Sequence, residues 1–133
     1  MTNKNKKLFI SVPMGGRSTE NIKLSMKKMH KIAEIILDED LDVIESFNEK
    51  NKPKNVKEEI ALLGESIKKL AEADYVIGLY EIDNFAGCLI ERDVALFYGI
   101  PYIRAFAEQV ATDLFVANDS HQEETSFDAD NLN

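Results

Sequence analysis

The sequence predicts a small doubly wound α/β domain in three layers, with a parallel sheet of four to five strands between two layers of helices. Short runs rich in strand-forming residues alternate with longer segments of helical periodicity. The run at 75–80 is apolar without alternation, as expected for a parallel strand buried on both faces. The 133 residues suit one hydrophobic core rather than two.

Two strands and a long helix are predicted in the first part of the chain. The run Leu-Phe-Ile-Ser-Val-Pro at 8–13 leads into Met-Gly-Gly-Arg, which is typical of a buried strand entering a glycine loop. Ser18 or Thr19 can cap the helix that follows, in which apolar residues recur at helical spacing from Ile22 to about Leu37. A second strand is predicted at residues 41–47, followed by a lysine-rich loop.

The second part of the chain continues the alternation. One apolar stripe predicts a helix that packs on the sheet, and it consists of Val56, Ile60, Leu63, Ile67 and Leu70. The remaining elements are a strand at 75–80, its exit loop at 81–86, a helix at 87–98, a strand at 100–104 and a weaker helix at 105–117. In the helix at 87–98, Glu91, Val94, Ala95 and Tyr98 share a face, and Gly99 ends it.

The charge is unevenly distributed along the chain. Five of the eight net negative charges lie in residues 118–133, so we expect a domain at 1–117 followed by a flexible acidic tail. The net charge disfavours nucleic acid polymers and anionic membranes as partners. The single Cys88 has no partner for an internal disulfide, and the two histidines lie far apart. A cytoplasmic protein without cofactor or metal is expected.

Ligands of doubly wound sheets bind outside the carboxyl ends of the strands, where the strand order reverses. One such segment is the turn formed by Met14, Gly15, Gly16, Arg17 and Ser18. Its two glycines allow close approach of the backbone, and the helix start supplies unpaired N–H groups, which together suit a phosphate. The alternative is a plain tight turn with a surface arginine.

Glu91 is the second candidate, because it is a carboxylate on an otherwise apolar face near the start of its helix. The helix dipole favours the anion, so Glu91 can stay charged while partly desolvated and act as a nucleophile toward a developing cationic carbon. The alternative is a structural ion pair with one of three arginines, Arg92, Arg17 or Arg104.

Further polar residues lie at the same predicted edge. The acids Glu45, Glu81 and Asp83 are candidates to protonate a leaving base or orient a sugar, with Asp83 favoured, although solvated rim acids are the common case. Cys88 is interpreted as a small core residue rather than a reactive thiol. The other candidate substrate contacts are Ser11, Tyr80, Asn84 and Gly87.

These segments together resemble the nucleoside 2-deoxyribosyltransferase superfamily over residues 7–104. The resemblance rests on the Met-Gly-Gly-Arg-Ser turn, on Ala-Asp-Tyr-Val-Ile-Gly-Leu-Tyr at 73–80, and on the pattern Gly87-Cys88-x-x-Glu91-x-x-x-Ala95-x-x-x-Gly99-x-Pro101. The Gly-Gly-Arg turn is similar to the branch that hydrolyses 2′-deoxynucleoside 5′-monophosphates. The Gly-Cys-x-x-Glu motif is similar to that of small members of the superfamily often carried by phages and prophages.

The resemblance implies that Glu91 attacks the anomeric carbon of a 2-deoxyribosyl group. It also implies that Gly15, Gly16 and Arg17 hold a 5′-phosphate, with Ser18 as a further candidate. It also implies a homodimer or larger assembly, for which the helix around 60–70 and the segment 106–115 are candidate contacts. The sequence departs from the family at Phe85, where a polar residue often touches the sugar or phosphate, and Ser11 is the only hydroxyl candidate near the first strand.

The expected function is therefore cleavage or transfer of the N-glycosidic bond of a 2′-deoxynucleoside or its 5′-monophosphate, with hydrolysis of the monophosphate favoured. The alternative is a domain that binds or sequesters a nucleotide-like small molecule without catalysis. Phe85 favours the alternative, whereas Glu91 favours the enzyme.

Overall fold

The computed structural model describes residues 4–47 and 53–110, and within them helices and strands alternate as predicted. The elements are β1 (Lys6–Ile10), α1 (Thr19–Leu37), β2 (Leu41–Val43), α2 (Val56–Leu70), β3 (Tyr75–Leu79), α3 (Ala86–Phe97), β4 (Tyr102–Ala105) and the short α4 (Ala107–Val110). The predicted α/β class is confirmed. The expected acidic tail at 118–133, and residues 111–117 before it, lie outside the described residues.

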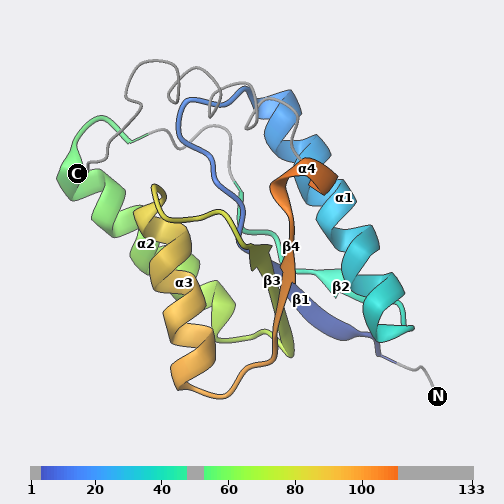
Figure 1. Ribbon diagram of the computed structural model, residues 1–133. Coiled ribbons are helices and arrows are strands. Elements are labelled where there is room, and N and C mark those ends of the chain that lie inside the picture. Colours follow the sequence, from blue (N-terminus) through green and yellow to red (C-terminus); the bar gives the residue numbers. More distant parts are fainter. Residues whose placement is uncertain (1–3, 48–52, 111–133) are drawn as a thin grey trace.

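The four strands form one parallel sheet in the order β2-β1-β3-β4. The chain steps from β1 out to β2 and then returns across β1 to β3, so the strand order reverses between β1 and β3. Helices α1 and α4 cover one face of the sheet, and α2 and α3 cover the other (Figure 1). This Rossmann-like arrangement makes the carboxyl ends of β1 and β3 the expected ligand-binding edge.

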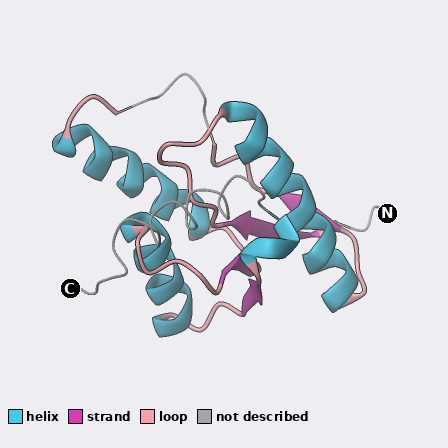
Figure 2. Cartoon of the chain, turned by 45° about the horizontal axis from the view of Figure 1, so that its top comes forward, coloured by secondary structure: helices cyan, strands magenta, loops and turns pink. Residues whose placement is uncertain are grey.

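Two apolar cores fill the space between the sheet and its two helical layers. Because side chains alternate along a strand, Leu8 and Ile10 pack toward α1, whereas Phe9 between them packs toward α2 and α3. Residues 8–10 of β1 and the whole of β3 therefore read as continuous apolar runs. Figure 2 shows the sheet from a second direction, with helices on both of its sides.

Local sequence signals explain where the helices begin and end. Ser18 caps α1 by accepting a hydrogen bond from the Asn21 amide at 3.1 Å, and Asn55 caps α2 in the same way with the Glu58 amide at 2.9 Å. Gly99, with φ of 76°, ends the α3 segment as predicted. No helix in the described part of the chain is long and apolar enough to cross a membrane.

Two elements differ from the prediction, β2 in its extent and α2 in its packing on the sheet. Strand β2 ends at Val43 instead of Phe47. Its pairing with β1 stops there, and the hydrogen bond from the Ile44 amide to the Leu8 carbonyl, at 2.9 Å, lies at the end of the paired segment. The apolar stripe of α2 packs on the sheet only near its C-terminal end, where Leu70 is fully buried, while Val56 and Ile60 are 67 and 65 % exposed. The N-terminal half of α2 projects away from the sheet (Figure 1).

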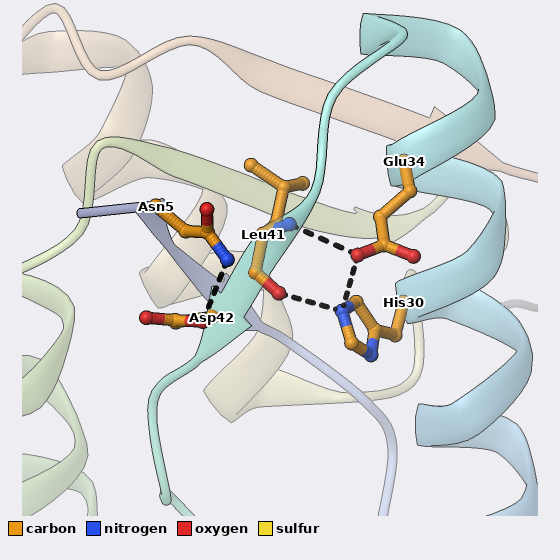
Figure 3. Close-up of polar contacts among 5 residues, drawn as sticks. All are labelled: Asn5, His30, Glu34, Leu41 and Asp42. Carbon is orange, nitrogen blue, oxygen red and sulfur yellow. Dashed lines mark hydrogen bonds and ion pairs between the residues drawn. The ribbon is translucent and has the colours of Figure 1, made fainter. Parts of the chain in front are cut away.

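Side chains of α1 close the outer edge of β2 at Leu41 (Figure 3). The Leu41 amide donates to Glu34 Oε2 at 2.9 Å, and His30 Nε2 lies 2.8 Å from the Leu41 carbonyl oxygen and 3.1 Å from Glu34 Oε2. Because both of these partners are acceptors, Nε2 carries the hydrogen and donates. The two outward-facing backbone groups of Leu41 are thus satisfied within the chain.

We predict that this contact makes folding stability depend on pH through Glu34. The Leu41 amide is the main cause that holds the pKa of Glu34 below its usual range, with His30 adding to the effect. An acid whose pKa is lowered by folding stabilises the protein above its unfolded pKa, and this stability is lost as pH falls through the folded pKa. Glu34→Gln should therefore flatten the decline in unfolding free energy at acidic pH. Urea titrations of the wild type and the variant from pH 3 to 7 measure this decline. An equally steep decline of the unfolding free energy in both proteins would contradict the prediction.

Candidate functional site

Glu91 lies at the centre of the candidate site, on the face of α3 that packs against the sheet. Only 9 % of the residue is exposed. The Ser11 hydroxyl, directly after β1, donates to Glu91 Oε1 at 2.6 Å, and the Ser66 hydroxyl of α2 donates to Oε2 at 2.7 Å. Both carboxyl oxygens are therefore held by hydroxyl donors from two other elements, at the edge where the strand order reverses.

Burial dominates the electrostatics of this carboxyl. Removal from water raises the pKa of Glu91 above its ordinary value, and the hydrogen bonds from Ser11 and Ser66 oppose the rise. The site thus holds a carboxyl that ionises at higher pH than an exposed glutamate and that has a fixed orientation. A group of this kind can act as a nucleophile when ionised or as an acid when protonated.

The alternative role of Glu91 in a structural ion pair does not correspond to the observed contacts. Glu91 forms no salt bridge with any residue that the structure describes. The three candidate arginines point elsewhere: Arg92 pairs with Asp93 at 3.0 Å, Arg104 lies over the Tyr102 ring at 5.2 Å, and Arg17 binds the Pro13 carbonyl at 2.8 Å.

The glycine turn after β1 is present and exposed. Gly16 has φ of 74°, a conformation that favours glycine, and the Arg17 amide closes the turn on the Met14 carbonyl at 3.2 Å. The Ser18 hydroxyl is occupied as the cap of α1. Gly15 is also exposed, so the turn presents its backbone beside the exposed Met14 side chain.

The Arg17 guanidinium lies along α1. Besides the Pro13 carbonyl, it donates from Nη2 to Ser25 Oγ at 2.6 Å and to the Asn21 carbonyl at 3.3 Å. Ser25 is buried and donates in turn to the Val110 carbonyl of α4 at 3.0 Å. Arg17 therefore connects the turn with α1 and, through Ser25, with α4.

Other predicted site residues are arranged differently. Tyr80, Asp83 and Asn84 are exposed on the segment that joins β3 to α3, and Gly87 lies partly buried at the start of α3. Glu81 accepts a hydrogen bond from the Ala107 amide at 2.9 Å, so its carboxylate holds the start of α4.

Glu45 is not part of the group around Glu91. It lines a hollow of about 300 Å³ with Lys7, Asp42, Lys69 and Glu72, where β2 meets the C-terminal end of α2. Because β2 pairs only with the first three residues of β1, Glu45 follows a strand that stops short of Ser11. Phe85 packs partly buried against the core, so its position supplies an apolar contact.

Sequence reasoning missed two residues of the site, Ser66 and Tyr102. Ser66 lies three residues after Leu63 and four before Leu70, so its place on the sheet-facing stripe of α2 was a usable signal. Tyr102 carried no such signal, because its position depends on strand register. Its ring extends from β4 over Gly78 of β3, where an added Cβ would overlap the Tyr102 hydroxyl oxygen.

The Tyr102 hydroxyl belongs to the same buried cluster as Glu91. Ser11 and Gly78 follow the paired residues Ile10 and Ile77, so they are neighbours on the face toward α3. The hydroxyl oxygen is buried without a hydrogen-bond partner among the residues that the structure describes. Burial, then the charge of the Cys88 thiolate, raises the pKa of Tyr102 to about 12.

Cys88 is buried beside this group, as the interpretation of a core thiol predicts. Burial and the negative charge of Glu91 raise the pKa of its thiol to about 12. Cys88 is thus a neutral thiol at physiological pH and a poor nucleophile. Within residues 4–47 and 53–110, no three His, Cys, Asp or Glu side chains gather in a way that could hold a metal ion.

We predict that Tyr102→Phe leaves the protein as stable as the wild type or stabilises it by up to about 1 kcal/mol, because a buried hydroxyl without a partner costs free energy. Tyr75→Phe is the matched control, since the Tyr75 hydroxyl donates to Glu39 at 3.2 Å and its loss should cost about 1 kcal/mol. Urea unfolding of both variants tests this. Equal destabilisation by the two changes would mean that the Tyr102 hydroxyl has a partner.

Comparison with protein-family models, with curated proteins and with solved structures gives no match for the chain. The doubly wound fold is established by its own strand order and helix placement. The resemblance to nucleoside 2-deoxyribosyltransferases stays a prediction from the motifs at 14–18 and 87–91.

Proposed function

We propose that the chain cleaves or transfers the N-glycosidic bond of a 2′-deoxynucleoside or its 5′-monophosphate, with Glu91 as the nucleophile. The observation that carries the proposal is the buried Glu91 carboxyl, held by Ser11 and Ser66 at the carboxyl edge of the sheet without an ion pair among the described residues. A carboxylate fixed in a poorly solvated place stabilises a developing oxocarbenium ion strongly.

The proposed reaction has two steps. The ionised Glu91 carboxylate bonds to the anomeric carbon while the bond from that carbon to the base breaks, and the base leaves with the bonding electron pair and takes up a proton. Asp83, exposed on the loop before α3, is the candidate donor of this proton. Water, or a second base, then attacks the same carbon as its bond to Glu91 breaks, and the proton that the attacking molecule loses passes to the Asp83 carboxylate. Glu91 is released as the carboxylate, which gives hydrolysis or transfer respectively.

The Gly15–Gly16 turn supports binding of a 5′-phosphate at the start of α1. The turn is exposed, and the first amides of a helix attract an anion. Since the Arg17 guanidinium binds Pro13 and Ser25, the backbone amides of the turn are the main phosphate donors in this proposal.

Non-catalytic binding of a nucleotide-like molecule is the second candidate. Two observations favour it: Phe85 contributes an apolar contact where a sugar contact is expected, and Asp83 and Asn84 are exposed rather than grouped with Glu91. The two functions differ in one product, because only the enzyme releases free base.

The decisive experiment is incubation of the protein with a panel of deoxynucleosides and their 5′-monophosphates, followed by chromatography of the free base. We expect Glu91→Ala to lower turnover by about 10³-fold or more while ligand binding is largely retained. Asp93→Asn is the matched control, since this carboxylate on the same helix pairs with Arg92 at the surface and should not affect turnover. Near wild-type turnover of Glu91→Ala would refute the assignment, and ligand binding without base release would establish the second candidate.

The same residue should link activity and stability to pH in opposite senses. Activity should fall as pH is lowered through the raised pKa of Glu91, because the nucleophile must be ionised. The folded state binds the proton of Glu91 more tightly than the unfolded state, so stability declines as pH rises from the unfolded to the folded pKa. Glu91→Gln should remove this decline and unfold at a free energy roughly 1 kcal/mol higher than the wild type at pH 8. Urea unfolding of both proteins at pH 4 and pH 8 tests this. A difference in unfolding free energy between Glu91→Gln and the wild type that is the same at both pH values would contradict the prediction.

A further inference from the structure

We propose that the outer edge of β4 pairs with β4 of a second copy of this chain, in antiparallel orientation about a two-fold axis, so that the two four-stranded sheets become one continuous sheet. The proposal goes beyond the chemistry suggested for Glu91 and does not depend on it. It assigns the expected self-association to a defined surface.

The hydrogen-bond pattern shows which backbone groups of β4 face outward. The Val76 amide donates to the Pro101 carbonyl and the Tyr80 amide to the Ala105 carbonyl, both at 2.9 Å. Odd-numbered residues from 101 to 105 therefore point their backbone groups toward β3. The amides and carbonyls of Tyr102 and Arg104 point away from the sheet, and no partner for them exists among the described residues.

The opposite edge of the sheet is shorter and is closed by side chains at Leu41. Strand β2 has only three residues, and the outward amide and carbonyl of Leu41 are bound by Glu34 and His30 (Figure 3). Exposed strand edges invite pairing with other chains unless they are blocked in this manner. In the part of the chain that the structure describes, no side chain blocks the outward groups of β4, and the Arg104 guanidinium lies over the Tyr80 and Tyr102 rings.

Exposed aromatic side chains flank both ends of β4. At its carboxyl end, Tyr80 and Phe106 stack with ring centroids 4.6 Å apart and are 53 and 51 % exposed. From the end of α3 the chain enters the amino end of β4 (Figure 1). There Phe97, the last residue of α3, is 83 % exposed, and Tyr98, its C-cap residue, is 80 % exposed. Exposure of large apolar groups around an open edge is typical of an interaction surface.

These features fit a second copy because they are complementary to themselves under a two-fold rotation. With Ile103 opposite Ile103 of the second copy, each Tyr102 faces Arg104 of the other chain, so the outward amides and carbonyls satisfy each other. Antiparallel pairing also brings the Tyr80 and Phe106 end of one copy toward the Phe97 and Tyr98 end of the other. The pairing would thus satisfy the outward backbone groups of both β4 strands and bring the exposed aromatic side chains at their ends together.

Analytical ultracentrifugation of the full chain over a concentration series tests the proposal. We expect the wild type to reach twice the 15.0 kDa mass of the chain, and higher salt to favour the dimer because each copy carries a net charge of −8. Arg104→Pro removes an outward amide and should leave a folded monomer, as judged by circular dichroism. Val43→Pro is the matched control, because the backbone amide of Val43 also points away from the sheet, but at the edge of β2. This variant should remain dimeric.

A second variant and hydrogen exchange exclude the rival occupants of the edge. Phe106→Lys, which leaves the strand backbone intact, should weaken the dimer at least about tenfold. The Tyr102 and Arg104 amides should exchange slowly in concentrated protein and at least about tenfold faster on dilution. A wild type that stays monomeric would overturn the proposal, and so would a dimer that survives both variants. Protection of these amides that does not change with dilution would also overturn it, and would assign the edge to the chain's own residues 111–133.

Discussion

The carboxyl of Glu91 joins three elements at the edge of the sheet where the strand order reverses. Ser11 extends from β1, Ser66 from α2, and Glu91 itself from α3, and two hydrogen bonds shorter than 2.8 Å fix them together. Burying a carboxyl is costly, and two neutral donors offset only part of that cost. The arrangement therefore lowers stability at neutral pH, where the buried carboxyl is ionised, and fixes the position of that carboxyl.

Most of the fold could be predicted from the sequence because each signal was local. The alternation of strands and helices, the Ser18 cap and the Gly99 terminus depend on neighbouring residues, and all three are confirmed. The place of Glu91 on the buried face of α3 was predictable for the same reason. Tyr98, expected on this face, is exposed, because α3 ends one residue before it and the chain turns toward β4.

The rest of the site depends on contacts between elements that are distant in sequence. Periodicity indicates which face of α2 is apolar, but not how far the helix extends beyond the sheet, so the exposure of Val56 and Ile60 could not be derived. The overlap of Tyr102 with the space above Gly78 depends on the register of β3 and β4. The direction of Arg17 depends on acceptors that only the folded α1 presents, namely the Asn21 carbonyl and Ser25 Oγ.

The contact of Arg17 with Ser25 connects the glycine turn with α4. Ser25 Oγ accepts from Arg17 and donates to the carbonyl of Val110, the last residue of α4. An anion that attracted the guanidinium out of this position would deprive Ser25 of its charged donor and weaken its hold on α4. Occupancy of the glycine turn would then be transmitted, through one arginine and one serine, to Val110, the last residue of α4.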